Sequence, residues 1–193
     1  MQEKTNDTLL FDAIEFATRA HRGQFRKGTR IPYIIHPLNV ARILLDAGCD
    51  MEIAAAGLLH DVLEDTPTDI DTIRQRFGDR IATLVLGSSE PDRTQSWENR
   101  KSHTLQQLTT VSSDILMVVA ADKLDNIRSI HHDLERNGEQ VWDRFSRPRI
   151  RQRWYYRSLA DIFDQRTNGG PLQSIAPLFR HYVDQVFPES GTN

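Results

Sequence analysis

A histidine-aspartate pair, His60-Asp61, follows an apolar run, and two further carboxylates, Glu64 and Asp65, come within the next turn. The run from Ile53 to Leu59 has the composition of a buried helix. Residues four apart share a helix face, so the pattern predicts two neighbouring polar rows on this helix. Burying an imidazole beside clustered carboxylates costs several kcal/mol unless they are paired or bind a cation. These residues therefore favour a cation site; the alternative is a helix end that turns polar at the surface.

A second apolar run ends in the same way. Residues 115–121 are apolar all round, which predicts a central helix, and Asp122 and Asn126 follow at a spacing of four. His36 stands directly before Pro37, which suits the first position of a helix. Taken alone, His36 is more typical of a packed core histidine than of a ligand. Two helix ends that each carry a carboxylate can nevertheless meet on one metal, with His36 as a third element.

Together these residues supply two imidazoles and two carboxylates, a donor set that suits Mn²⁺, Fe²⁺ or Zn²⁺ and leaves positions for water and phosphate. The order H…HD…D resembles the signature of the HD-domain metal-dependent phosphohydrolases. The flanking residues resemble the hydrolase domain of the RelA/SpoT family, and most of all its small single-domain (p)ppGpp hydrolases, from about Phe11 to Leu159. The matching segments are Ala20-His21-Arg22-Gly23-Gln24 with Arg26-Lys27, Pro32-Tyr33 before His36-Pro37, residues 60–66, and Ala121-Asp122-Lys123-Leu124-Asp125-Asn126.

The resemblance implies an all-α, HD-domain helical bundle of about eight to ten helices. It also implies an enzyme of the stringent response that removes the 3′-pyrophosphate of guanosine 3′,5′-bis(diphosphate), giving GDP or GTP and pyrophosphate. Its residue assignments are His36, His60, Asp61 and Asp122 for Mn²⁺, Glu64, Asp65 and Asn126 for catalysis, and Arg26, Lys27, Arg151 and Tyr155 for the nucleotide.

Two features depart from the family pattern. The loop from Gly87 to Gln95 lacks the Thr-Asp-Asp-Lys type of sequence, so contacts to the distal phosphates do not carry over. Asp125 stands where an aromatic residue or histidine is frequent, and it adds negative charge near a phosphate site. An HD phosphohydrolase that acts on another nucleotide or phosphorylated metabolite therefore stays open as an alternative.

Two basic segments have more than one interpretation. Residues 21–30 form a basic loop bounded by glycines, which could hold an anion or be solvated. Residues 147–157 carry five arginines interleaved with Trp154, Tyr155 and Tyr156. Basic and aromatic residues in alternation are typical of nucleic-acid binding, and a solvated amphipathic helix explains them equally well.

Composition limits the remaining classes. The 193 residues predict a single HD domain with a core at 8–166, a C-terminal helix at 171–187 and a short tail. The net charge of −3 argues against nucleic acid as a partner. Cys49 is the only cysteine, which excludes an intramolecular disulfide and fits a reducing cytoplasm. No run of eighteen apolar residues and no signal peptide is visible, so we expect a cytoplasmic protein without a membrane span; a homo-oligomer stays open.

Hydrophobic spacing predicts further helices and no convincing strand. The expected ranges are 8–21, 37–47, 69–77, 80–86 and 171–186, with another helix opening at Trp97.

Overall fold

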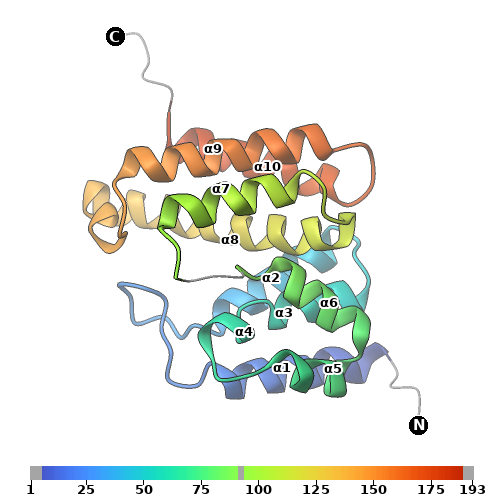
Figure 1. Cartoon of the computed structure of the whole chain (residues 1–193). Coiled ribbons are helices and arrows are strands. Elements are labelled where there is room, and N and C mark those ends of the chain that lie inside the picture. Colours follow the sequence, from blue (N-terminus) through green and yellow to red (C-terminus); the bar gives the residue numbers. More distant parts are fainter. Residues whose placement is uncertain (1–5, 91–93, 189–193) are drawn as a thin grey trace, which may run out of the picture.

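The computed structural model describes residues 6–90 and 94–188 as a bundle of helices (Figure 1). Within these ranges there are ten α-helices, one 3-10 helix and no strand, apart from an isolated bridge between Phe25 and Pro32. The prediction of an all-α bundle is confirmed. In chain order the elements are α1 (Asn6–Ala20), α2 (Ile35–Asp46), α3 (Met51–Leu59), α4 (Val62–Asp65), α5 (Ile70–Phe77), α6 (Asp79–Ser88), α7 (Trp97–Leu108), α8 (Ser113–Asn137), η1 (Gly138–Arg144), α9 (Arg149–Arg166) and α10 (Leu172–Val186).

The long helix α8 lies at the centre of the bundle. Its first half is the predicted apolar run, and the Ser112 hydroxyl caps it by accepting the Ile115 N–H. Figure 1 shows α9 and α10 on one side of α8, and the layer of α2, α3 and α6 on the other. None of the described helices is long and apolar enough to cross a membrane.

Helices α2 and α3 approach each other closely at Gly57. A Cβ atom at this position would lie 2.5 Å from Leu44 Cδ1 and 3.2 Å from Val40 Cγ1 of α2. Glycine therefore allows a separation of these helices that no larger residue would permit. The close approach matters for the site, because α2 carries His36 and α3 leads directly into His60.

The two predicted polar rows do not lie on one continuous helix, because α3 ends at Leu59 and a separate single turn, α4, follows. His60 Nδ1 lies 2.8 Å from the Gly57 carbonyl oxygen, which would accept the Asp61 N–H in a continuous helix. Asp61 has φ −94° and ψ −5°, away from ideal helical values. The break turns Asp61 and Glu64 toward one cavity and leaves the side chain of Asp65 exposed.

Helix α2 begins at Ile35, two residues before the predicted start at Pro37. The N–H groups of Ile35 and His36 bond to the carbonyl groups of Pro32 and Tyr33, so a tight turn leads into the helix. Proline fits within this first turn because helix N-terminal N–H groups have no intrahelical partner. His36 is therefore held inside the helix rather than in front of it.

The other predicted helices are confirmed within one or two residues. Helix α5 is capped by Asp69 and ends at Gly78, which has φ +90°. Gly87 and Ser88 belong to the last turn of α6, so the predicted loop from Gly87 begins too early. Gly87 faces Ile115, whose Cδ1 would lie 2.5 Å from an added Cβ. The remainder of that loop includes residues 91–93, which lie outside the described residues.

Candidate active site

Four side chains from three parts of the chain converge between α2, α3 and α8. Ligand atoms of His36, His60 and Asp122 lie within 4.8 Å of one another. Asp61 Oδ2 lies 2.9 Å from His60 Nε2 and 3.5 Å from His36 Nε2. Asp122 Oδ1 lies 3.2 Å from His36 Nε2. The four residues predicted to bind metal are therefore neighbours in space.

Both imidazole rings are oriented by a partner behind them. His36 Nδ1 lies 2.6 Å from Asp125 Oδ2, and His60 Nδ1 lies 2.8 Å from the Gly57 carbonyl oxygen. An imidazole that donates its Nδ1 proton presents Nε2 as an acceptor or a metal ligand. In the described structure His60 Nε2 is buried and makes no hydrogen bond of acceptable geometry. A divalent cation would give this buried nitrogen a partner, so the residues present fit a metal.

The electrostatics of the cluster also favour a cation. Burial lowers the pKa of His36, but hydrogen bonds to Asp122, Asp125 and Asp61 raise it to about 9. Burial raises the pKa of Asp61 and of Asp122, yet nearby positive charge lowers both well below the usual value, chiefly from His60 for Asp61 and from Lys123 for Asp122. The carboxylates therefore stay ionised and attract positive charge.

Neighbouring side chains hold the two carboxylates in place. The Tyr33 hydroxyl donates to Asp61 Oδ2, and burial together with the charge of Asp61 raises the Tyr33 pKa, so the phenol stays a donor. Asn126 Nδ2 donates to Asp122 Oδ1 at 2.5 Å. Lys123 Nζ lies 2.7 Å from Asp122 Oδ2. Each aspartate is thus oriented by at least one donor.

The sequence predicted that Asp125 adds negative charge near a phosphate site, but in the structure its carboxylate contacts other side chains. Its Oδ2 is directed at His36, and its Oδ1 accepts from Asn39 Nδ2 at 2.9 Å. Arg26 Nη2 lies 3.6 Å from the same carboxylate and offsets its charge. Asp125 therefore orients the His36 imidazole, which is one of the predicted metal ligands.

The two acidic residues after the pair take different positions. Glu64 lines a cavity beside the metal cluster, and its Oε1 accepts the Glu90 N–H at 2.8 Å. The Asp65 side chain is exposed and does not line this cavity, although its backbone carbonyl accepts from Gln24. Glu64 is thus the member of the predicted catalytic pair that faces the cluster.

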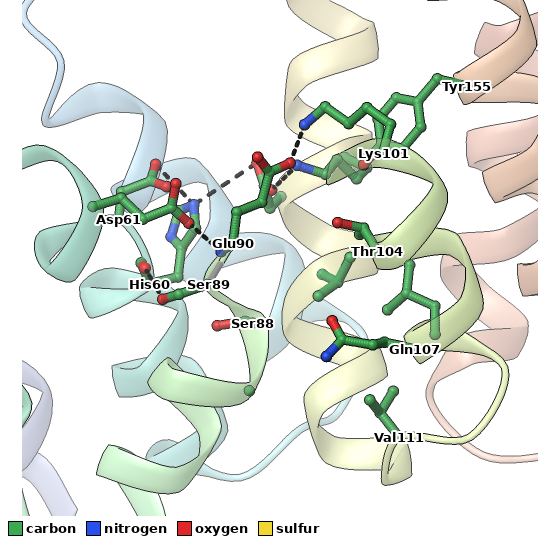
Figure 2. Close-up of a pocket in the computed structure, with 16 residues that line it drawn as sticks. His60, Asp61, Ser88, Ser89, Glu90, Lys101, Thr104, Gln107, Val111 and Tyr155 are labelled. Atoms are coloured by element: carbon green, nitrogen blue, oxygen red, sulfur yellow. Dashed lines mark hydrogen bonds and ion pairs between the residues drawn. The ribbon is translucent and has the colours of Figure 1, made fainter. Parts of the chain in front are cut away.

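The cavity beside the metal cluster, called here the metal-side cavity, opens between α3, α6, α7 and α8 (Figure 2). Ionisable and hydroxyl groups dominate its wall near the cluster. The polar lining residues there include His60, Asp61, Glu64, Ser89, Glu90, Lys101, Asp122, Lys123 and Tyr155.

A second cavity lies on the other side of Asn126 and contains Arg26 and Lys27. Arg26 Nη2 donates to Asn126 Oδ1 at 3.0 Å, which links this second cavity to Asp122 through the same asparagine. Lys27 is exposed at its rim, and Tyr156 contributes an aromatic face. The basic loop therefore has one arginine directed inward and does not act as a purely solvated segment.

Tyr155 and Arg151, the two predicted nucleotide contacts on α9, lie in different places. Tyr155 lines the metal-side cavity, whereas Arg151 is exposed in an outer groove with Trp154. Two other arginines of the basic segment are paired with carboxylates: Arg147 with Glu98 at 2.8 Å and Arg149 with Glu139 at 2.8 Å. Tyr155 and Tyr156 are buried, so the alternation seen in the sequence does not form one basic and aromatic surface.

Several residues of the site carried no predicted role: Tyr33, Asn39, Glu90, Lys101 and Lys123. Asn39 is one helical turn after His36, a spacing that places both on one face. Lys123 directly follows Asp122. Glu90 and Lys101 lie far from the motif in sequence, and no local spacing connects them with it.

Comparison with known proteins agrees with this geometry. A family model described as "HD domain" matches residues 13–149, which is well over half of the chain. The chain belongs to the HD-domain family. Metal dependence is a property of this fold, and the His/Asp cluster described above provides the corresponding site.

Among curated relatives, the human and mouse guanosine-3′,5′-bis(diphosphate) 3′-pyrophosphohydrolases MESH1 share this HD domain over nearly their whole length. The human protein is 36% identical over 89% of this chain and 93% of its own, and the mouse protein 39% identical over 94% of each. An Aquifex aeolicus enzyme of the same description is 39% identical over 61% of this chain. This chain spans only 17% of the length of that bacterial relative.

Two solved structures are similar to this chain over most of its length. The crystal structure of lmo0812 from Listeria monocytogenes EGD-e superposes with a TM-score of 0.75 at 38% identity, over 80% of this chain and 99% of that one. A second structure, titled as a metazoan ortholog of SpoT that hydrolyses ppGpp, has a TM-score of 0.72 at 26% identity, over 94% of this chain and 98% of the other.

Proposed function

We propose that this HD domain hydrolyses the 3′-pyrophosphate of (p)ppGpp, converting ppGpp and water into GDP and pyrophosphate, and pppGpp into GTP and pyrophosphate. The observation that carries the proposal is the His36, His60, Asp61 and Asp122 cluster with Glu64 in the adjoining cavity. The similarity to MESH1 proteins over nearly the full chain supports the substrate.

The metal that we propose is Mn²⁺, because two imidazoles and two carboxylates suit it among divalent ions. When bound, it would lower the pKa of a water molecule and neutralise charge on a phosphoryl oxygen. His36, His60, Asp61 and Asp122 would hold it. Asp125 and Gly57 fix the imidazole orientations, and Tyr33 and Lys123 fix the carboxylates.

Glu64 is the group that we assign to the proton of the attacking water. Its carboxylate lines the same cavity as His60 and Asp122, and a carboxylate beside a metal-bound water can accept that proton. Asn126, which donates to Asp122, would help to place the water. Asp65 is exposed and would act on Glu64 or on the substrate from the rim.

The nucleoside would lie toward Arg26 and Lys27, with the 3′-pyrophosphate over the metal. Arg26 contacts Asn126, so the second cavity and the metal cluster meet at one residue, as a substrate that spans both requires. Tyr155 would contact the phosphate side of the substrate from α9. Arg151 would reach the nucleotide only from the outside of α9.

We also propose a cytoplasmic location. The chain has a single cysteine and so cannot form the intramolecular disulfides that are common in oxidising compartments.

A panel of substrates tests this proposal against the remaining alternative, an HD phosphohydrolase for another nucleotide. Metal-loaded protein is incubated with ppGpp, pppGpp, GTP, ATP and pyrimidine nucleotides, and products are separated chromatographically. We expect turnover of ppGpp and pppGpp with no comparable loss of the others. Efficient turnover of a different nucleotide with intact ppGpp would favour the alternative.

A further inference from the structure

Two lysines line the metal-side cavity, Lys101 from α7 and Lys123 from α8. Arg100, also from α7, does not line the cavity, but it reaches Glu90, which does. Lys123 Nζ is engaged by Asp122 Oδ2 at 2.7 Å and so serves the metal cluster. Lys101 and Arg100 instead share one carboxylate, that of Glu90.

Glu90 extends into the cavity between the metal cluster and these cations (Figure 2). One of its oxygens pairs with Lys101 Nζ, and the other lies 2.9 Å from Arg100 Nη1. The side chain is only 15% exposed. Burial raises the pKa of Glu90, but Lys101, Lys123 and Arg100 outweigh this effect and lower it. The carboxylate is therefore a buried anion held between cations on one side and the acidic ligands on the other.

Two donors beside this pair have no acceptor. Tyr155 is 3% exposed, lines the cavity, and its hydroxyl makes no hydrogen bond within the described structure. Arg100 Nε is likewise buried without a partner there. Lys101 Nζ lies 4.9 Å from the centre of the Tyr155 ring, so the lysine and the tyrosine are neighbours in this wall. Buried donors are nearly always satisfied, so unpaired donors next to Glu90 indicate that a further acceptor binds here.

We propose that Lys101, Arg100 and Tyr155 form a phosphate subsite that the Glu90 carboxylate occupies in the substrate-free protein. This inference rests on the proposed function, since the ligand is the pyrophosphate that the reaction would release. A phosphate group has three terminal oxygens and can satisfy the lysine, the guanidinium and the phenol together. Glu90 neutralises the buried Lys101 when no substrate is present, and it must turn away when phosphate binds. Glu90 thus acts as an internal competitor that weakens binding of anions.

Binding of inorganic pyrophosphate to the metal-loaded protein tests the subsite without turnover. Isothermal titration calorimetry would compare the unmodified protein with Glu90→Gln and Lys101→Met, both of nearly unchanged shape. We expect Glu90→Gln to bind pyrophosphate about tenfold more tightly and Lys101→Met about tenfold more weakly, because each changes one charge-assisted contact. Glu139→Gln, which removes an exposed carboxylate that pairs with Arg149, should leave the affinity unchanged.

Melting curves of each variant establish that it is folded. If Glu90→Gln is unfolded, Glu90→Asp replaces it, because it keeps the charge but shortens the reach to Lys101, and pyrophosphate should then bind more tightly than to the unmodified protein. Equal or weaker binding by the folded Glu90 variant would overturn the proposal and leave Glu90 as a structural partner of Lys101. Unchanged binding by Lys101→Met would also overturn it. A protein that leaves ppGpp intact but shows the expected affinities would contradict the proposed function and keep the subsite.

Discussion

At the scale of single residues, the chemistry depends on how each donor atom is oriented. His36 and His60 direct Nε2 at one point because Asp125 and the Gly57 carbonyl hold Nδ1. Glu64 lines the cavity beside this point, and its Oε1 accepts the Glu90 N–H. Substitutions of the histidines and of Glu64 can therefore test metal binding and proton transfer separately.

Glu64→Gln should keep the metal and lose turnover. The amide is nearly isosteric but cannot accept the proton of the attacking water, and loss of a general base typically costs about 10²–10⁴-fold in rate. His60→Ala should lose both metal and activity. Bound metal and single-turnover rate are measured on the same preparation. Full metal with a normal rate in Glu64→Gln would remove Glu64 from the mechanism, and lost metal would make it a ligand.

Asp125→Ala should weaken metal binding by about 10–100-fold, which is the usual effect of removing a group that orients a ligating histidine. Asp125→Asn should weaken it less, since its amide oxygen still accepts from His36 Nδ1. Metal titration monitored by competition with a chelating dye gives the affinities. Asp46→Asn on the exposed side of α2 is the control. Unchanged affinity in Asp125→Ala would show that the His36–Asp125 contact does not support the metal.

The sequence predicted the four residues that the structure brings together but not the contacts that orient them. His36, His60, Asp61 and Asp122 stand out because polar residues end apolar runs or precede a proline. Asp125 also stood out, yet its contact with His36 joins residues 89 positions apart and depends on the packing of α2 against α8. Local spacing does not report such contacts, and the same holds for Glu90 and Lys101.

At the scale of elements, Gly57 sets the separation of α2 and α3 and hence the distance between His36 and His60. Gly57→Ala would place a Cβ 2.5 Å from Leu44 Cδ1. Overpacking typically costs about 1–3 kcal/mol, and the gain in helix propensity offsets up to about 1 kcal/mol of this. We expect lower stability in urea denaturation and weaker metal binding.

Leu44→Ala provides the matched test of that mechanism. Leu44→Ala alone should destabilise the protein by leaving a cavity, and the double variant should lose less stability than the sum of the two single changes. Additive losses, or a Gly57→Ala protein as stable as the unmodified one, would show that the close approach is not limiting.

Periodicity predicted most helices because their apolar positions recur at helical spacing, as in α5, α6 and α10. It failed at the junction of α3 and α4. There a side chain, His60 Nδ1, takes the carbonyl that the continuing backbone would use. Such competition is decided by the position of one imidazole within the site, which a hydrophobic pattern does not contain.

At the scale of the whole molecule, the cluster joins α2, α3 and α8, so metal and stability are coupled. Removing the metal leaves carboxylates close together, and a metal that binds only the native state stabilises it by mass action. Chelation should lower the melting temperature, and added Mn²⁺ should raise it in a concentration-dependent manner. Asp122→Ala should abolish this response; a full metal-dependent shift in that variant would place the metal elsewhere.

The identity of the bond that breaks tests the central claim most directly. Metal-loaded protein is given ppGpp in water enriched in ¹⁸O, and the products are resolved by mass spectrometry. We expect GDP and pyrophosphate in equal amounts, with the ¹⁸O in pyrophosphate, because water attacks phosphorus and the bond to the 3′ oxygen breaks; His60→Ala should give neither product. Release of orthophosphate, ¹⁸O in GDP, or unchanged ppGpp in the presence of bound metal would contradict the account.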